Sequence, residues 1–274
     1  MKKFSMLFLF LLSAMIVIAG CGTAEDKGTN QEGNGAKTTE QDLLSKVKEE
    51  GKLLIGTEGT YPPFTFHDDK GELTGFDVEI AREIAKRLGV EAEFLETQWD
   101  AMFAGLDAKR FDMIANQVGI RPDRQEKYDF SDPYITSAAV LVVHADNAEV
   151  KSFEDIKGKK AGQSLTSNYA DLARSFEAEI VGVEGFNQAV ELINSKRVDV
   201  TINDKLSVLD FKKQRPDAAI QIVDTSEDAA KSGLMFRKGN EPLVEEVNKA
   251  LAEIIEDGTY EEISVKWFGE NVLK

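Results

Sequence analysis

Apolar residues recur along the chain with two different periods, and each period predicts a different kind of element. On the helix predicted over residues 76–88, apolar side chains follow one another at four-residue spacing: Phe76, Ile80, Ile84 and Leu88. Continuous apolar runs, such as residues 53–55, predict strands instead. Helices and strands alternate in this way after residue 40, which is typical of the α/β class.

Turn residues and caps set the boundaries of these elements. The expected helices cover residues 41–50, 76–88, 99–110 and a region from residue 243 onward. The expected strands cover residues 52–57, 111–115, 138–143 and 232–237. Gly51 and Gly89 end the first two helices, and Thr97 is the expected N-cap of the third.

An internal echo suggests that one unit occurs twice. Residues 106–117 resemble residues 193–204 at an offset of 87 residues. The identical pairs are Lys109 and Lys196, Arg110 and Arg197, Asp112 and Asp199, and Asn116 and Asn203. The echo marks either two similar lobes or a coincidence between two common helix–strand junctions. In the first case, both strands end in polar residues at the carboxyl edge of a parallel sheet, where open α/β folds bind ligands.

The order of the elements predicts how the chain divides into lobes. An extended run at residues 138–143 lies between the two copies of the echo, and another at residues 232–237 follows the second copy. We therefore expect one lobe from residues 41–142 plus 235–274, and a second lobe inserted at residues 143–234. Two strands that cross side by side between the lobes would form a hinge.

The first residues read as an export signal. Lys2 and Lys3 precede an apolar run of about 16 residues, which is short for a membrane-spanning helix of ~20 residues. Residues 1–20 are therefore expected to be a cleaved signal peptide, with an uncleaved membrane anchor as the alternative. Residues 18–21 resemble a bacterial lipobox, which would lipidate Cys21, the only cysteine of the chain.

The segment that follows Cys21 has the composition of a tether. Residues 22–40 contain no apolar residue larger than alanine, so they are expected to be disordered and to span ~25 Å. Removal of residues 1–20 takes away two lysines and no acid, so the mature formal charge is −16 − 2 = −18. A charge of this sign argues against nucleic acid as a partner.

Patterns of known catalytic or metal sites are absent from the sequence. The two histidines, His67 and His144, have no further metal-ligating residue at a suitable spacing. No His-Glu-x-x-His, P-loop or nucleophile-elbow motif occurs. We therefore expect neither an enzyme nor a bound metal or cofactor.

Several motifs together resemble the polar amino acid-binding family of ABC importers. They lie at residues 56–64, 75–78, 99–102, 109–112, 116–124, 128–131 and 267–269, and the resemblance covers residues 41–274. Residues 98–100, 116–119, 167–169 and 203–205 are similar to the L-cystine-binding lipoproteins of that family. The resemblance implies a type II periplasmic-binding-protein-like fold, with two mostly parallel sheets flanked by helices and joined by two hinge strands.

A free amino acid presents a carboxylate and an ammonium on one carbon, so its binder needs a cationic fork and an anion. Arg124 stands at the position of the family's carboxylate-binding arginine, and a solvated surface arginine is the alternative. Asp204 resembles the family's ammonium-binding carboxylate, and a helix N-cap is the alternative.

The resemblance implies further contacts around this head group. Gly119, through its backbone N–H, and Ser167 and Asn168 complete the carboxylate site, and Gln117 joins Asp204 at the ammonium. The remaining wall and side-chain contacts are Glu58, Tyr61, Trp99, Asn116, Tyr169 and Asn203. Core packing is the alternative for Tyr61 and Trp99.

The function implied is capture of L-cystine between closing lobes and delivery to an ABC permease. Histidine, glutamine or another polar amino acid is the first alternative. A dehydratase on the same fold, with Glu58 as the protonated acid, is the second. We expect a monomer, lipid-anchored on the extracytoplasmic face of a Gram-positive cell membrane.

Overall fold

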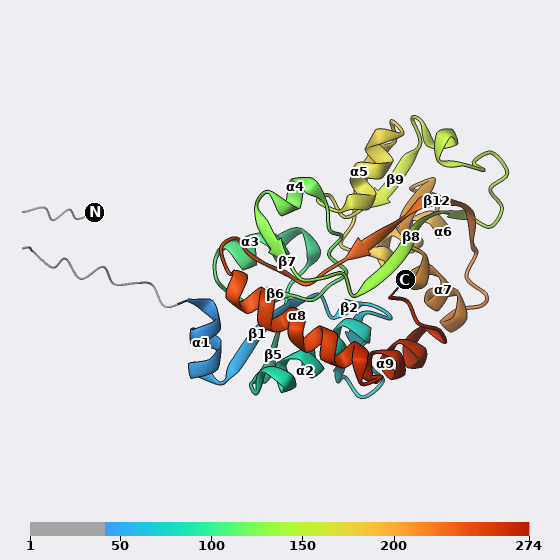
Figure 1. Ribbon diagram of the computed structural model, residues 1–274. Helices are drawn as coiled ribbons and strands as arrows, with labels where there is room; N and C mark the ends of the chain where they lie inside the picture. The colour runs from blue at the N-terminus through green and yellow to red at the C-terminus, as the bar shows by residue number, and fades with distance from the viewer. Residues whose placement is uncertain (1–41, 274) are drawn as a thin grey trace, which may run out of the picture. The chain divides into compact units, whose positions relative to one another are not determined.

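A computed structural model describes residues 42–273, in which helices and strands alternate as in the α/β class (Figure 1). This class agrees with the sequence prediction. The predicted signal peptide over residues 1–20, the predicted lipidation site Cys21 and the predicted tether over residues 22–40 lie outside the described residues. Between residues 42 and 273, no helix combines the length and the apolar character that crossing a membrane requires.

The first of two five-stranded sheets has the strand order β5–β1–β6–β13–β7. Its strands are β1 (Lys52–Thr57), β5 (Glu91–Glu96), β6 (Met113–Ile114), β7 (Tyr128–Phe130) and β13 (Met235–Arg237). Leu53 and Ile55 of β1 face a core with α1, α2, α8 and α9, whereas Leu54 between them faces α3. The bounds of these helices are α1 (Leu43–Glu50), α2 (Phe76–Leu88), α3 (Trp99–Asp107), α8 (Glu241–Glu256) and α9 (Thr259–Phe268).

The second sheet has the order β10–β9–β11–β8–β12 and is covered on both faces. Its strands are β8 (Ile135–His144), β9 (Lys160–Gln163), β10 (Glu179–Gly182), β11 (Val200–Asp204) and β12 (Ile220–Ser232). Leu141 and Val143 of β8 pack on the face with α5, whereas Val140 and Val142 pack on the face with α6 and α7. The helices are η1 (Phe153–Ile156), α5 (Asn168–Ser175), α6 (Phe186–Asn194) and α7 (Lys205–Gln214).

Short elements complete the described part of the chain. A three-stranded sheet precedes α2, and a single turn of helix precedes β7. They are β2 (Thr60–Tyr61), β3 (Thr65–His67), β4 (Leu73–Thr74) and α4 (Pro122–Gln125). β2 carries Tyr61, whose side chain reaches Asn203 of the second lobe.

Each five-stranded sheet contains parallel and antiparallel pairs in equal number. β1 is parallel to β5 and β6, and β9 is parallel to β10 and β11. β13 is antiparallel to β6 and β7, and β8 is antiparallel to β11 and β12. The prediction of mostly parallel sheets is therefore too strong. β8 and β13 enter from the other lobe, without the helical crossover within one lobe that a parallel strand needs.

The helix over residues 99–110 differs from its prediction at both ends. α3 follows Gln98 and has no side-chain cap, so Thr97 is not its N-cap. The backbone N–H of Thr97 instead donates to Thr57 O at 2.9 Å, next to the pairing of β5 with β1. The helix ends at Asp107 because Lys109 adopts φ 58°, which is outside the helical region. The other corrections are smaller: α1 begins at Leu43, α8 at Glu241, and β6 covers only Met113–Ile114.

The sequence echo corresponds to a repeated structural unit. Lys109 and Lys196 both lie in the left-handed region, with φ of 58° and 57°. Asp112 accepts a hydrogen bond from Leu54 N at 3.1 Å, and its counterpart Asp199 accepts one from Lys160 N at 2.8 Å. Each copy thus connects a helix to a strand and ties the turn to the neighbouring parallel strand. This agreement favours two similar lobes over coincidence.

The pairing of β8 bears on the boundaries of the lobes. Residues 135–144 pair along their whole length with β11 and β12 of the second sheet, so a boundary at 142/143 would divide this strand. We propose that the first crossing between lobes lies at residues 131–134, before β8. The second crossing then lies between Ser232 and Met235, next to the predicted boundary at 234/235.

Candidate functional site

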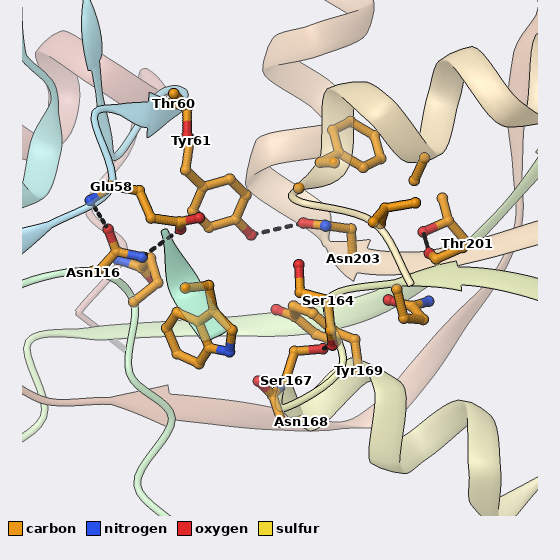
Figure 2. A pocket seen from close by; sticks show the side chains of 18 residues that line it. Glu58, Thr60, Tyr61, Asn116, Ser164, Ser167, Asn168, Tyr169, Thr201 and Asn203 are labelled. Atoms are coloured by element: carbon orange, nitrogen blue, oxygen red, sulfur yellow. Dashed lines mark hydrogen bonds between the residues drawn. The ribbon is translucent and has the colours of Figure 1, made fainter. Parts of the chain in front are cut away.

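A pocket lies between the two lobes at the carboxyl ends of β1, β6, β9, β10 and β11 (Figure 2). It contains about 600 Å³ of empty space, including its open mouth. The first lobe contributes Glu58, Thr60, Tyr61, Trp99, Asn116 and Gln117. The second lobe contributes Gly162, Gln163, Ser164, Ser167, Asn168, Tyr169, Val183, Gly185, Phe186, Ala189, Thr201 and Asn203. This edge is the one where open α/β sheets bind their ligands.

The structure brings together nine of the twelve residues that the sequence predicted around the substrate. The nine that line the pocket are Glu58, Tyr61, Trp99, Asn116, Gln117, Ser167, Asn168, Tyr169 and Asn203. The other three are not part of the lining: Arg124 contacts Trp99, Asp204 contacts Tyr169, and Gly119 contacts Arg124. The contacts of these three decide whether they can still act on a ligand.

Arg124 is buried at 6% exposure, so it is not a solvated surface arginine. Its guanidinium carbon lies 5.6 Å from the centre of the Trp99 ring and 5.3 Å from that of Phe103. Its Nη1 donates to the carbonyl of Gly119 at 3.0 Å. No carboxylate of residues 42–273 pairs with it, and burial lowers the pKa of Arg124 to about 10. A buried cation without a counter-charge beside a pocket favours an anionic ligand group.

Asp204 has one carboxylate oxygen committed to the fold and another that faces a pocket residue. Its Oδ1 accepts hydrogen bonds from Leu206 N at 2.8 Å and from the Ser137 hydroxyl at 2.9 Å. It is therefore the N-cap of α7, as one sequence interpretation held. Its Oδ2 lies 3.4 Å from the hydroxyl of Tyr169, which lines the pocket. Burial raises the pKa of Asp204 to about 6.

A hydrogen-bonded pair closes the first-lobe side of the pocket (Figure 2). Asn116 Nδ2 donates to Glu58 Oε2 at 2.7 Å, and Asn116 Oδ1 accepts from Glu58 N at 2.8 Å. Burial raises the pKa of Glu58 to about 7. Next to this pair, the Tyr61 hydroxyl donates to Asn203 Oδ1 at 2.7 Å and so joins the two lobes across the pocket.

Asp77 is a residue of the site that the sequence reasoning missed. It is fully buried at the start of α2 and accepts hydrogen bonds from Gln117 N and Gln117 Nε2, both at 2.8 Å. These bonds hold Gln117 at φ 52° and occupy its side-chain nitrogen, which leaves the amide oxygen for a cationic ligand group. Burial raises the pKa of Asp77 to about 7. Its place in the motif at residues 75–78 was the available signal.

Two buried N–H groups that line the pocket have no hydrogen-bond partner among the described residues. They are Trp99 Nε1 in the first lobe and Gln163 Nε2 in the second. Unsatisfied buried donors are rare in folded proteins, so a ligand acceptor is a natural partner for each. Trp99 was expected at the site, whereas nothing in the sequence singled out Gln163.

The part of the chain that the structure describes holds no cluster of three or more His, Cys, Asp or Glu side chains with the geometry of a metal site. His67 lies away from the pocket, with Nδ1 at 3.2 Å from Gly59 O and Nε2 at 3.1 Å from Glu96. The chemistry of the pocket thus consists of amides, hydroxyls, aromatic rings and carboxylates, with one buried guanidinium behind them.

Comparisons with known proteins agree with this geometry. The model of the bacterial extracellular solute-binding proteins, family 3, matches residues 53–270. Over 275 aligned residues that cover 100% of both chains, the sequence is 50% identical to the L-cystine-binding protein TcyA of Bacillus subtilis (strain 168).

Two solved structures allow a comparison of lobe arrangement. The L-cystine solute receptor of Neisseria gonorrhoeae, in an unliganded open conformation, is 46% identical, with a TM-score of 0.56 over 84% of this chain and 99% of that one. An ancestral arginine-binding protein bound to arginine is 38% identical, with a TM-score of 0.76 over 80% of this chain and 99% of that one. The ligand-bound structure therefore superposes better, although its sequence is less similar.

Proposed function

The chain belongs to the bacterial extracellular solute-binding proteins of family 3, and from this premise we propose that it captures L-cystine for an ABC importer. The observation that carries the proposal is a buried, unpaired Arg124 against Trp99 of the first lobe and a buried Asp204 against Tyr169 of the second, where Trp99 and Tyr169 both line the pocket between the lobes. The sequence identity of 50% to an L-cystine-binding relative, over the full length of both chains, favours cystine among the polar amino acids.

The head group of the ligand would lie between the two lobes. Its carboxylate would approach Arg124, with the helix N-terminus at Ser167 and Asn168 on the other side. Its ammonium would approach Asp204 Oδ2 and the amide oxygen of Gln117. The buried charges of protein and ligand would then neutralise each other, which offsets the cost of burying them.

The disulfide of cystine would lie against aromatic walls. Tyr61, Trp99 and Tyr169 line the pocket, and sulfur makes favourable contacts with the edges of aromatic rings. Closure of the lobes would exclude water and present a joined surface to the permease. No covalent chemistry on the ligand is part of this function. Glu58, the candidate acid of a dehydratase, instead pairs with Asn116.

The location and assembly belong to the same proposal. A monomer held at the extracytoplasmic face of a Gram-positive cell membrane by lipid on Cys21 would remain close to its permease. The tether over residues 22–40 would leave the lobes free to open, close and dock.

Calorimetry with L-cystine and a panel of polar amino acids tests the proposal. We expect cystine to bind most tightly, and Arg124→Leu or Asp204→Asn to weaken it about 30- to 1,000-fold, as truncating one partner of a buried charge pair does. Arg110→Leu removes an exposed arginine and serves as the control. Tighter binding of histidine or glutamine than of cystine would reject the ligand. Unchanged affinity in folded Arg124→Leu would reject the head-group site.

A further inference from the structure

A buried carboxylate behind the pocket holds one of the lining residues in place. Asp77 is fully buried and accepts hydrogen bonds from the backbone N–H and from Nε2 of Gln117, both at 2.8 Å. Gln117 lines the pocket, and its φ of 52° lies in the left-handed region, which is unfavourable for glutamine. The two hydrogen bonds therefore maintain a backbone conformation that Gln117 would leave without them.

A tyrosine hydroxyl of the hinge lies beside the same carboxylate. Tyr134 is fully buried at the end of the proposed crossing at residues 131–134, and its ring stacks on Phe76, the residue before Asp77, with centroids 6.0 Å apart. Burial, and then the charge of Asp77, raise the pKa of Tyr134 well above its usual value. The hydroxyl has no hydrogen-bond partner in the described part of the chain, which is unfavourable for a buried group. In the closed lobes, Asp77 thus bonds to Gln117 and leaves the hinge hydroxyl unsatisfied.

Backbone hydrogen bonds connect both crossings to the partners of this carboxylate. The N–H of Tyr134 donates to Ser232 O at 3.1 Å and ties the first crossing to the second. The N–H of Gly233, in the second crossing, donates at 3.0 Å to the carbonyl of Val118, the residue after Gln117. A movement of the hinge therefore acts on the tyrosine and on the segment that carries the pocket glutamine.

We propose that Asp77 is a positioning residue that is shared between the pocket and the hinge. Bonded to Gln117, it keeps the amide oxygen of Gln117 toward the ligand and favours the closed lobes. Turned toward the hydroxyl of Tyr134, it releases Gln117 and favours the open lobes. This inference rests on the proposed function, since it assigns the regulation of the same site. A bound ammonium fixes Gln117 and thereby keeps Asp77 away from the hinge tyrosine.

Removal of the hinge hydroxyl tests the open arrangement. Tyr134→Phe deletes an oxygen without a partner in the closed lobes, so the melting temperature of the cystine complex should not fall. Without the competing donor, cystine should bind about tenfold more tightly, chiefly through slower dissociation. Calorimetry and stopped-flow fluorescence at about pH 8, where Asp77 with its pKa of about 7 is charged, measure affinity and rates.

A matched control and a second observable accompany this variant. The hydroxyl of Tyr128 donates to Asp107 at 3.0 Å within the first lobe, so Tyr128→Phe should leave the affinity and both rates for cystine unchanged. Small-angle X-ray scattering without ligand should give Tyr134→Phe a smaller radius of gyration than the unsubstituted protein, because the open lobes lose a hydrogen bond.

A paired exchange tests the closed arrangement. In Asp77→Asn, one acceptor oxygen becomes an N–H donor, which Gln117 can bond only by turning its amide oxygen away from the ligand. Cystine should therefore bind about 10- to 100-fold more weakly. Gln117→Glu alone sets two carboxylates against each other, whereas the double variant again places a donor opposite an acceptor. The double variant should therefore lose less affinity than the sum of the two single changes.

The outcomes distinguish this inference from the proposed function. Failure of the unsubstituted protein to bind cystine would reject the proposed function itself. Tight binding by the unsubstituted protein, with unchanged or faster release from Tyr134→Phe, would overturn the shared role of Asp77 alone. Additive losses in the paired exchange would overturn it as well, because Asp77 would then only support the fold.

Discussion

Two buried carboxyl groups, Asp77 and Asp204, and the half-buried Glu58 lie around the pocket, and their partners give them different roles. Asp77 has both oxygens occupied by Gln117, and Glu58 is held by Asn116. Asp204 combines structural bonds of Oδ1, from Leu206 N and the Ser137 hydroxyl, with an Oδ2 that lies 3.4 Å from the hydroxyl of the pocket residue Tyr169. This second oxygen places Asp204 to receive an ammonium.

The pKa of Asp204 predicts a pH dependence of ligand binding. Burial raises this pKa from 3.8 to about 6 in the unliganded protein, so the carboxyl is neutral below pH 6 and charged above it. An ammonium binds the charged form, so the affinity for cystine should rise up to about tenfold per pH unit below pH 6 and level off above it. Calorimetry between pH 4.5 and about 8 measures this.

The same shift has the opposite effect on the stability of the unliganded protein. Since the folded pKa exceeds the unfolded value, folding favours the protonated acid, and this contribution to the free energy of unfolding is lost as the pH rises through about 6.

A variant tests whether Asp204 causes the pH dependence of binding. Asp204→Asn keeps an N-cap side chain and should abolish the pH dependence of binding near 6. Any dependence that remains near pH 7 would belong to Glu58 or Asp77. An unchanged profile in Asp204→Asn would contradict the assignment.

At the scale of elements, the sequence pattern predicted those helix ends that depend on interactions within the helix itself. The helix over residues 76–88 has the predicted ends, because its apolar period and Gly89 act within the helix itself. Thr97 failed as a cap because its backbone is engaged by β1, a contact that no local rule includes. Gln163 could not be found, since an amide at a strand end becomes notable only when burial leaves it unpartnered. The sequence left open whether Asp204 is a helix N-cap or a ligand-binding carboxylate. Its Oδ1 caps α7 and its Oδ2 faces a pocket residue, so the two roles are compatible.

The packing of β1 against α3 gives a prediction at the same scale. A Cβ on Gly56 of β1 would lie 2.6 Å from the ring of Phe111, and one on Gly105 of α3 would lie 2.7 Å from it. Gly56→Ala should therefore destabilise the protein by about 1–3 kcal/mol, measured by urea or thermal unfolding. Phe111→Leu should relieve the clash, so the double variant should lose less stability than the sum of the two single changes. Simple additivity would contradict this packing.

At the scale of the molecule, the two lobes contact each other through the segment of the second lobe at residues 165–171, beside the pocket. The Asp100 carboxylate accepts hydrogen bonds from Leu165 N at 3.2 Å, Thr166 N at 3.0 Å and the Thr166 hydroxyl at 2.7 Å. Arg121 pairs with Asp171 at 2.8 Å. Together with the better superposition on a ligand-bound relative than on an open one, these contacts indicate closed lobes.

Asp100 is accordingly expected to control the release of ligand rather than its capture. Its three acceptor bonds form only when the lobes meet, so Asp100→Ala should speed dissociation of cystine about tenfold and change association little. Stopped-flow fluorescence of Trp99 at the pocket can follow both rates. Asp100→Asn, which keeps one acceptor oxygen, should fall between the two proteins.

A matched control separates closure from the general loss of a surface carboxylate. Glu93 pairs with Lys52 at 3.0 Å entirely within the first lobe, so Glu93→Ala should leave both rates unchanged. If Asp100→Ala slowed association instead, the carboxylate would act on the open form, and the contacts to Thr166 would not be what retains the ligand. If neither rate changed, Asp100 would not retain the ligand. The hydrogen bond from the Tyr61 hydroxyl to Asn203 would then be the contact that holds the lobes together across the pocket, and Tyr61→Phe should speed release.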